Sequence, residues 1–475
     1  MALKPLASAV SAAALLLASS VVAVAQDKHY EPTLESLNSH PLPAWYDDAK
    51  LGIFIHWGLY SVPGWAPVSH SEHDFEGKDY LKYDPYAEWY LNTVRLEGSP
   101  TQEYDRQHYG PNHNYYDFAA DFNKESKKWD PAKMAAIFRD AGAKYVVLTS
   151  KHHEGFTLWP SKVPNPNQQG LHAERDIVGD LSEAVRADGL KMGIYYSGGY
   201  DWTFDRGPIE VNPDYDSVKP QSKAYGDYAF AHAEELIRLY HPSVLWNDID
   251  WPKTGKTLQL MADYYNATPD GVLDDRYGVQ HSDFTSPEYA KLDQISKKKW
   301  EECRGLGASF GYNRAEGENE TIKPQDLIEL LVDIVSKNGN LLLDVGPEPD
   351  GTIPPIQMDR LEKLGAWLKQ NGESIYGTHP WTRANGTTNQ LTAEGKAVEL
   401  RFMQKDGSLY ATLFGKPAAS TVLLHNLHVT PGSAIALLGG TAPVKWTQRA
   451  DDVEVTLPST LPGSYAWVLK MQLAK

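Results

Sequence analysis

Residues 130–156 read DPAKMAAIFRDAGAKYVVLTSKHHEGF, and this stretch contains both kinds of element from which most of the chain is built. Asp130 can cap a helix, Pro131 suits the first helical position, and Gly142 suits the end. Apolar residues recur between them at the spacing of one helical face. The run YVVLTS, at 145–150, follows and is apolar on both faces, as in a parallel strand covered by helices. The polar run KHHEGF begins where that strand should end.

The same alternation continues along most of the chain. Further runs typical of buried strands lie at 52–58, 192–197, 244–248, 272–278, 309–313 and 340–347. Helical spacing occurs between them at 176–188, 225–240, 257–268, 324–337 and 354–371. This pattern predicts an α/β fold, a (β/α)8-like barrel of the TIM type, over residues 26–380. A doubly wound dinucleotide fold is less well supported, because no G-x-G-x-x-G sequence opens a helix.

The pattern changes near residue 380. Residues 381–475 contain short, alternating runs such as VELRFMQ, LYATLF and DVEVTLP, separated by turn-forming stretches such as KDG and GKP. None of these residues shows convincing helical spacing. We therefore expect a small C-terminal all-β domain, most simply a β-sandwich. No low-complexity linker precedes it, so we expect the two domains to pack together.

Residues 1–25 have the features of a secretory signal peptide. Lys4 forms a short basic region, an apolar stretch follows, and Ala23-Val24-Ala25 makes an A-x-A cleavage site before Gln26. A membrane anchor is the weaker interpretation, because the apolar run is short and interrupted by serines. We expect export to the periplasm or the medium, with no later segment spanning a membrane.

The composition limits the partners. The net charge is −17 and no cluster of Lys and Arg compensates for it, which argues against nucleic acid and against an anionic membrane surface. The chain has 14 Trp and 27 Tyr, whose flat faces suit the C–H faces of sugars, although a large core also uses them. Homo-oligomerisation is left open by the sequence.

Polar side chains follow most of the predicted strands. The active site of such a barrel lies at the C-terminal ends of its strands, so these side chains should converge on one rim. Neighbours on a strand point to opposite faces, so His152 and His153 can share a site only if the strand has broken into a loop. The residues at these ends are His56 and Trp57, 151–154, Tyr195 and Tyr196, Trp246–Asp248, Arg276, and 312–314.

Two carboxylic acids are needed if the rim hydrolyses a glycosidic bond. Asp248 ends an apolar strand, and Arg276, on the next strand along the chain, could hold it ionised as a nucleophile. Glu288 lies on a segment after Arg276 with the reach to cross the site. Glu301 is the second candidate for the acid/base, but it precedes the predicted strand at 309–313 and should lie nearer the wrong end of the barrel.

The order of these stretches resembles the exported bacterial α-L-fucosidases of glycoside hydrolase family 29. The matching runs include LGIFIHWG, AEWY, KHHEGF, GIYYSGGYDW, VLWNDIDWP, DDRYG and SKNGNLLLDVGP, and they cover almost the whole barrel in order. The resemblance implies a retaining enzyme that uses no metal or other cofactor and forms a covalent fucosyl-enzyme intermediate. Its expected substrate is a fucosylated oligosaccharide or glycan.

The resemblance also implies roles for single residues. Asp248 would be the nucleophile and Glu288 the acid/base, with Glu301 as the alternative. For the tyrosine pair we expect Tyr195, not Tyr196, to face the site. The residues expected to bind fucose are His56, Glu88, Trp89, His152, His153, Tyr195, Trp246 and Arg276.

Two other functions fit parts of the pattern. A metallohydrolase could use His56, His152 and His153 with Asp248, but no H-x-H, H-E-x-x-H or C-x-x-C spacing occurs. A carbohydrate-binding protein without activity would keep the aromatic residues but would not need both carboxylates.

Overall fold

The computed structural model describes residues 28–68, 80–211, 214–441 and 443–474. The predicted signal peptide, residues 1–25, lies outside the described residues. Across the described part of the chain, no helix is both long enough and apolar enough to cross a membrane.

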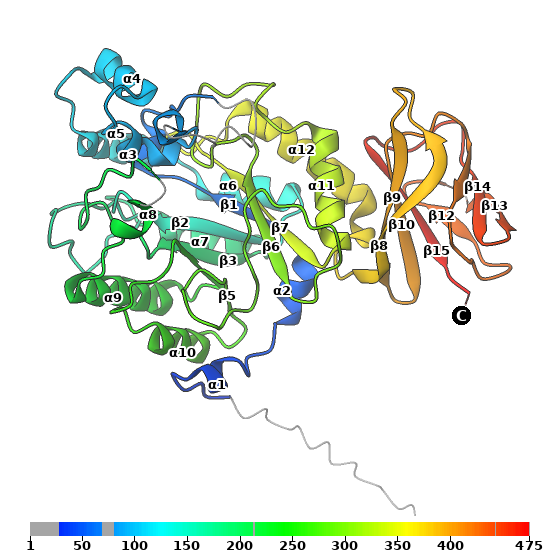
Figure 1. The fold of residues 1–475 in the computed structure, drawn as a ribbon, viewed down its shortest axis with the longest axis horizontal. Helices are drawn as coiled ribbons and strands as arrows, with labels where there is room; N and C mark the ends of the chain where they lie inside the picture. The colour runs from blue at the N-terminus through cyan, green and yellow to red at the C-terminus, as the bar shows by residue number, and fades with distance from the viewer. Residues whose placement is uncertain (1–27, 69–79, 212–213, 442, 475) are drawn as a thin grey trace, which may run out of the picture.

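Seven parallel strands form a curled sheet in the first part of the chain, in the order β5-β4-β3-β2-β1-β7-β6 (Figure 1). The predicted α/β barrel is therefore confirmed, with seven regular strands. They are β1 (Leu51–Ile55), β2 (Tyr145–Lys151), β3 (Lys191–Ser197), β4 (Val244–Asp248), β5 (Val272–Leu273), β6 (Trp300–Gly305) and β7 (Gly339–Val345).

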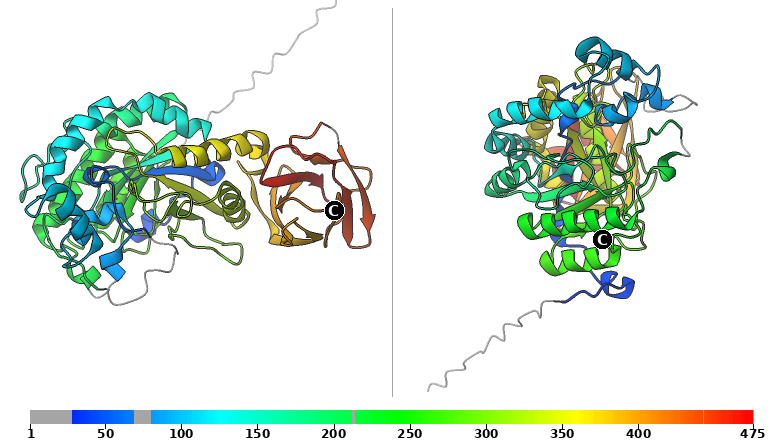
Figure 2. Two further views of the ribbon diagram at one scale, coloured as in Figure 1. Left: turned by 90° about the horizontal axis from the view of Figure 1, so that it is seen from above. Right: turned by 90° about the vertical axis from the view of Figure 1, so that its left-hand side faces the viewer.

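Helices cover the outer face of this sheet, as the two views of Figure 2 show. The long ones are α6 (Pro131–Asp140), α7 (Ile177–Ala187), α9 (Lys223–Tyr240), α10 (Thr257–Ala267), α11 (Pro324–Ser336) and α12 (Pro355–Asn371). Asp130 caps α6, accepting a hydrogen bond from the Lys133 N–H at 3.1 Å, as the sequence predicted. The remaining helices are α1 (Leu34–Leu37), α2 (Ala44–Ala49), α3 (Tyr90–Thr93), α4 (Pro100–Tyr109), α5 (Phe118–Glu125) and α8 (Asp214–Ser217).

The prediction of a strand at 309–313 is wrong. The strand that pairs with β7 is β6, Trp300–Gly305, which carries charged residues that hid it in the sequence. Residues 309–313 form a loop, because carboxylates accept hydrogen bonds from the backbone there. Glu316 accepts from the N–H groups of Ala308 and Ser309, and Glu88 accepts from the N–H of Gly311, at 2.7 to 2.9 Å. Those N–H groups therefore do not enter a strand ladder.

An irregular segment, residues 283–289, fills the gap between the edge strands β5 and β6. The N–H of Asp283 donates to the carbonyl of Leu273 at 2.9 Å, and residues 285 and 288 form parallel bridges to β6. The N–H of Glu301 donates in turn to the carbonyl of Thr285 at 2.8 Å. This segment takes the place of an eighth strand, and it carries Glu288 to the rim.

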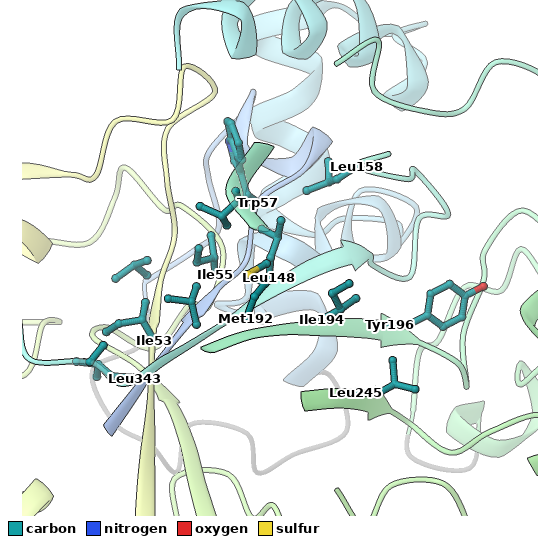
Figure 3. Packing of buried hydrophobic residues seen from close by; sticks show 14 of the residues in the cluster. Ile53, Ile55, Trp57, Leu148, Leu158, Met192, Ile194, Tyr196, Leu245 and Leu343 are labelled. Atoms are coloured by element: carbon teal, nitrogen blue, oxygen red, sulfur yellow. The ribbon is translucent and has the colours of Figure 1, made fainter. Parts of the chain in front are cut away.

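The two faces of the sheet bury different sets of side chains. Alternate residues, among them Ile53, Leu148 and Ile194, point outward and pack under the helices (Figure 3). The residues between them point into the barrel and form a second cluster, which includes Phe54, Tyr195 and Trp246. The strict alternation of a strand therefore decides which side chains can reach the site.

The C-terminal part of the chain is all β, as predicted. Its eight strands run antiparallel and close into a barrel, in the order β10-β15-β12-β13-β14-β11-β8-β9. It differs from the expected sandwich because β8 pairs with both β9 and β11, which removes the free edges of two separate sheets. The strands are β8 (His379–Leu391), β9 (Ala397–Lys405), β10 (Ser408–Phe414), β11 (Thr421–Leu424), β12 (Ile435–Leu437), β13 (Pro443–Arg449), β14 (Asp452–Thr456) and β15 (Ala466–Gln472).

This second barrel packs on α11 and α12, at the end of the molecule seen on the right in Figure 1. The indole N–H of Trp367, on α12, donates to the carbonyl of Ala466 on β15 at 2.9 Å. Met403, Tyr410 and Val468 of the second barrel belong to the same apolar cluster as the helices of the first. The two parts therefore share buried surface.

Replacing Trp367 with Ala should destabilise the protein by about 3–5 kcal/mol, because it removes a large side chain that is only 4% exposed from this interface. Thermal or denaturant unfolding measures the change. The control is Leu391→Ala on β8, where the side chain is 53% exposed and the expected change is below about 0.5 kcal/mol. Equal shifts for the two variants would contradict a shared core.

Candidate active site

A cavity of about 200 Å³ lies at the C-terminal ends of the barrel strands. Nine of the residues predicted for the site line it: His56, Glu88, Trp89, His152, His153, Tyr195, Trp246, Asp248 and Glu288. The structure also places six residues there that the sequence reasoning did not assign to it: Phe54, Tyr86, Tyr215, Ile249, Cys303 and Phe310. Such a mixture of acids, imidazoles and aromatic faces can bind a sugar ring and act on a bond beside it.

Asp248, the last residue of β4, is the most completely bonded carboxylate of the cavity. Its Oδ1 accepts from Arg276 Nη1 at 2.7 Å and from the Ile249 N–H at 2.9 Å, and its Oδ2 accepts from the Tyr195 hydroxyl at 2.9 Å. Burial alone would raise the pKa of Asp248, but Arg276 and these hydrogen bonds outweigh it, so the pKa lies below its usual value. Asp248 is therefore held as a carboxylate.

The backbone after Asp248 has an unusual conformation. Ile249 and Asp250 have φ of 59° and 75°, in the left-handed region that a β-branched residue such as Ile rarely adopts. This turn points the Ile249 N–H back at the carboxylate. It also packs tightly against the segment after β3, since a Cβ on Gly199 would lie 1.8 Å from the Ile249 carbonyl oxygen. The glycine pair after β3 therefore makes room for the turn that fixes Asp248.

Arg276 joins the two carboxylates that the sequence singled out. Its Nη1 lies 2.7 Å from Asp248 Oδ1 and 2.6 Å from Glu288 Oε1, so these oxygens can be no farther apart than the two distances together, about 5.3 Å. Retaining glycosidases separate their carboxyl groups by about 5–5.5 Å, and inverting ones by about 6.5–9.5 Å. The pair therefore has retaining geometry.

Two contacts hold the guanidinium in place. It lies over the ring of Trp246, 4.6 Å from the centroid, and it donates through Nη2 to the carbonyl of Ser286 at 2.7 Å. Arg276 does not line the cavity of about 200 Å³ itself. It lies behind the two carboxylates that it bridges, and its direct contact with the sugar stays a prediction.

Glu301, the alternative acid/base, lies in the floor of the barrel below Trp246. It is fully buried on β6 and accepts hydrogen bonds from the hydroxyls of Tyr46, at 2.8 Å, and Tyr145. It also accepts from the indole N–H of Trp246 at 3.1 Å. With these three donors and no surface on the cavity, Glu301 orients Trp246 and has no access to a glycosidic oxygen.

His152 and His153 follow the end of β2 at Lys151, and both line the cavity, with ring centroids 3.8 Å apart. The strand has broken into a loop at this point, as the sequence required. Lys151 points away from the cavity and is fully buried, where it donates to Asp201 at 3.1 Å. Tyr196 also points to the outer face, whereas Tyr195 faces the site.

The imidazoles turn their Nδ1 atoms away from the cavity. Nδ1 of His56 lies 2.6 Å from Asp344 Oδ1, and Nδ1 of His153 lies 2.6 Å from Ser197 Oγ. Burial lowers the pKa of both rings to about 3, so they are neutral near pH 7. His152 Nδ1 is buried 3.7 Å from Glu154 Oε2, and neither atom has a hydrogen-bond partner within the described ranges.

The tautomer of His153 follows from its neighbour. The Ser197 hydroxyl donates its one proton to the carbonyl of Tyr200 at 2.9 Å, so it must accept from His153 Nδ1–H. The Nε2 of the neutral ring is then an acceptor, 4.0 Å from Asp248 Oδ2. The two neighbouring acceptors, His153 Nε2 and Asp248 Oδ2, favour a ligand with hydroxyl groups that can donate hydrogen bonds.

Glu88 closes another wall of the cavity. It belongs to a short 3-10 helix, Ala87–Trp89, and its Oε2 accepts from the Gly311 N–H at 2.7 Å. Burial raises the pKa of Glu88 to about 7, so it is partly protonated at neutral pH and can donate as well as accept. The ring of Trp89 lies edge-on to His153, with centroids 5.3 Å apart.

The residues that the sequence reasoning missed had weak signals. Phe54 is inward by strand alternation, two residues before His56, and could have been inferred. Phe310 was hidden by the wrong assignment of 309–313 to a strand. Tyr86 precedes a short 3-10 helix and Tyr215 lies on the four-residue helix α8, and the sequence does not fix the course of either segment. Cys303 is buried, as expected for a lone cysteine, and burial raises the pKa of its thiol.

A metal site does not coincide with this cavity in the described part of the chain. The one group of carboxylates and imidazoles close enough there to share an ion is Asp47, Asp48 and His379. Asp47 and Asp48 lie in α2, just before β1 and so at the opposite end of the barrel strands from the cavity, and His379 begins β8. Asp47 is already paired with Lys299 at 2.9 Å.

Comparison with known proteins agrees with this geometry. The family model described as alpha-L-fucosidase matches residues 17–373, and the model of the alpha-L-fucosidase C-terminal domain matches residues 395–472. The chain belongs to the α-L-fucosidase family. The resemblance seen in the sequence motifs is therefore confirmed, and the enzyme is a glycoside hydrolase that cleaves α-L-fucosides.

Relatives from distant organisms match over nearly their full length. Tissue alpha-L-fucosidase of Rattus norvegicus is 33% identical over 96% of this chain and 96% of its own length. An alpha-L-fucosidase of Branchiostoma floridae is 34% identical over 96% of this chain and 99% of its own. The crystal structure of Thermotoga maritima alpha-fucosidase in complex with a mechanism-based inhibitor is 42% identical, with a TM-score of 0.85, covering 93% of this chain and 99% of that one.

Replacing Arg276 with Met should move the acid limb of the kcat/KM profile to higher pH. We expect the ionised carboxylate of Asp248 to be the reactive form, and Arg276 keeps its pKa low. Without Arg276, burial raises that pKa, so ionisation needs a higher pH. A nitrophenyl fucoside reports the profile, because its leaving group needs little protonation.

The matched control is Arg276→Lys, which keeps a positive charge near Asp248 and should shift the limb less. An acid limb that stays in place in the Met variant would show that Arg276 does not set the ionisation of Asp248.

Proposed function

We propose that Asp248 is the nucleophile and Glu288 the acid/base of a retaining α-L-fucosidase. The observation that carries this assignment is the single Arg276 nitrogen shared by both carboxylates, which limits their separation to about 5.3 Å. Asp248 has the depressed pKa that a nucleophile needs, and Glu288 has the more accessible side chain, 37% exposed. A proton donor to the departing oxygen must be reachable from outside the fucose pocket.

The first step forms a covalent intermediate. A carboxylate oxygen of Asp248 attacks the anomeric carbon while the bond from that carbon to the glycosidic oxygen breaks. Protonated Glu288 gives its proton to the departing oxygen, which leaves as an alcohol. Tyr195 and Arg276 lie on Asp248 throughout and orient it.

The second step returns the enzyme to its first state. Ionised Glu288 takes a proton from a water molecule, and that oxygen attacks the anomeric carbon from the side that the leaving group vacated. The ester bond to Asp248 breaks and restores the carboxylate. Two inversions at one carbon give fucose with retained configuration.

The rest of the cavity fits a fucosyl ring. Neutral imidazole nitrogens and Glu88 offer directional hydrogen bonds to hydroxyl groups, while Phe54, Phe310 and Trp246 offer apolar faces for the methyl group and the C–H face. A buried site that hydrogen-bonds hydroxyl groups rejects sugars that lack them, so this subsite should be strict.

Substitution of each acid should give a different result with azide. Asp248→Gly should lower turnover of every fucoside by about 10⁴-fold or more. Azide should then restore some turnover by direct displacement and yield the inverted fucosyl azide. Glu288→Ala should retain activity on nitrophenyl fucoside but lose it on substrates with poor leaving groups. Azide should rescue it with the retained product, because the covalent intermediate still forms.

Glu301→Ala is the comparison that decides between the two glutamates. It should reduce activity on good and poor leaving groups alike, because it disturbs Trp246, and azide should not restore it. If Glu301→Ala were rescued by azide and Glu288→Ala were not, the acid/base assignment would have to be reversed. NMR of the azide products distinguishes the two configurations.

We also propose export, on the basis of the basic, apolar and A-x-A features in residues 1–25. Protein recovered from the periplasm or medium of a bacterial host should begin at Gln26 by N-terminal sequencing. Ala25→Pro should block this cleavage, and a mature protein that keeps residues 1–25 would refute the proposal. The oligomeric state stays open, and light scattering of the same sample measures it.

A further inference from the structure

A second cavity, of about 600 Å³, opens beside the fucose pocket. It is lined by Tyr200, Tyr215, Lys219, residues 248–250, Asp275, Arg276 and residues 285–287. Tyr215, Asp248 and Ile249 line both cavities. The second cavity therefore meets the first at the carboxylate that we assign as the nucleophile.

The residue that we propose as proton donor lies where the two cavities meet: Glu288 lines the first cavity, and the preceding Pro287 lines the second. The Glu288 side chain is 37% exposed, whereas Asp248 is buried. A substrate bound for cleavage has its glycosidic oxygen near Glu288, with fucose on one side and the leaving group on the other. The fucose side is the small, enclosed cavity, so the leaving group must extend into the second one.

We propose that the second cavity is the subsite for the leaving-group sugar, that Lys219 and Asp250 bind its hydroxyl groups, and that it selects a neutral sugar. This inference rests on the fucosidase function proposed above. It adds a location, two recognition residues and a charge preference for the part of the substrate that departs.

Lys219 and Asp250 form a fixed polar pair at the wall of this cavity. Lys219 Nζ lies 2.7 Å from Asp250 Oδ2 and 2.9 Å from Asp216 Oδ1. The ammonium group has three donors, so one remains for a ligand. Asp250 Oδ1 has no hydrogen bond from any residue in the described ranges, and the Asp250 side chain is 52% exposed. The pair thus offers a donor and an acceptor side by side.

Both ends of this pair are held in position. Asp250 has its backbone in the left-handed turn that the packing of Gly199 against Ile249 defines. Lys219 is anchored by two carboxylates and its side chain is only 16% exposed. Preorganised groups lose little conformational entropy when a ligand binds, which suits a recognition site.

The charges around the cavity disfavour an anionic leaving group. Lys219 is compensated by Asp216 and Asp250, and Arg276 is compensated by Asp248 and Glu288. Asp275 adds a further carboxylate to the lining, whose Oδ1 accepts hydrogen bonds from Ser286. A sulfate or carboxylate on the leaving sugar would find no uncompensated cation on this wall. A neutral sugar meets hydroxyl-binding groups and the rings of Tyr200 and Tyr215.

The test compares two substrates that share fucose and differ in the leaving group. Fucosyl fluoride leaves the second cavity empty, and a neutral fucosyl-galactose disaccharide fills it. Lys219→Ala and Asp250→Ala should each lower kcat/KM for the disaccharide by about 5- to 10-fold, the effect of one lost hydrogen bond. The loss with fucosyl fluoride should stay below about twofold. Lys445→Ala, an exposed lysine on β13, is the matched control and should affect neither substrate.

The charge preference has its own measurement. A fucosyl-galactose carrying a sulfate on the galactose should be cleaved more slowly than the neutral disaccharide by the wild type. Asp250→Asn removes one carboxylate and should narrow this difference. A sulfated substrate that reacts as fast as the neutral one would overturn the preference.

The results of these assays distinguish failure of the proposed subsite from failure of the proposed fucosidase function. Equal losses on fluoride and disaccharide, or no loss on the disaccharide, would overturn the subsite while leaving the fucosidase assignment intact. A wild type that hydrolyses neither substrate would overturn the proposed function itself. Retained fluoride hydrolysis in the Lys219 and Asp250 variants also shows that they are folded.

Discussion

The site depends on one buried cation. Two carboxylates within about 5.3 Å of each other, one of them buried, would repel and take up a proton if nothing lay between them. The guanidinium of Arg276 compensates both through one nitrogen, and its flat face rests on Trp246. Trp246 is oriented in turn by Glu301, through its indole N–H. The position of the two carboxylates is therefore set by a chain of contacts that reaches down to the barrel floor.

Around this charged centre, the imidazoles of the pocket wall are kept neutral. Burial holds His56 and His153 uncharged, and their anchored Nδ1 atoms leave Nε2 as the free nitrogen. A neutral hydrogen-bonding wall reads the positions of hydroxyl groups without adding a field that would compete with Arg276. Recognition and reaction thus use different kinds of interaction within one small cavity.

Much of this arrangement was predictable from the sequence, because strand period and strand ends are local properties. The alternation of buried faces selects Tyr195 over Tyr196, and the ends of β2 and β4 carry His152, His153 and Asp248 to one rim. The missed strand β6 shows the limit of that reasoning. It buries Glu301 among partners that lie far away in the chain, and no local pattern reveals them. The strand predicted at 309–313 was wrong for a related reason: the nearby Glu316 and the distant Glu88 accept hydrogen bonds from backbone N–H groups at 308–311.

The two acids that we propose as nucleophile and acid/base are carried by backbone of different kinds. Asp248 ends a regular strand inside the sheet and is followed by a turn with no spare room, so changes in chain length near it would disturb the barrel. Glu288 sits on the irregular segment that fills the barrel gap through isolated bridges. Such a segment can accept insertions and deletions without shifting any strand register. Evolution or design could therefore change the length and sequence of the segment that carries Glu288, and with it the preference for the leaving group. The position of Asp248 at the fucosyl carbon would stay the same.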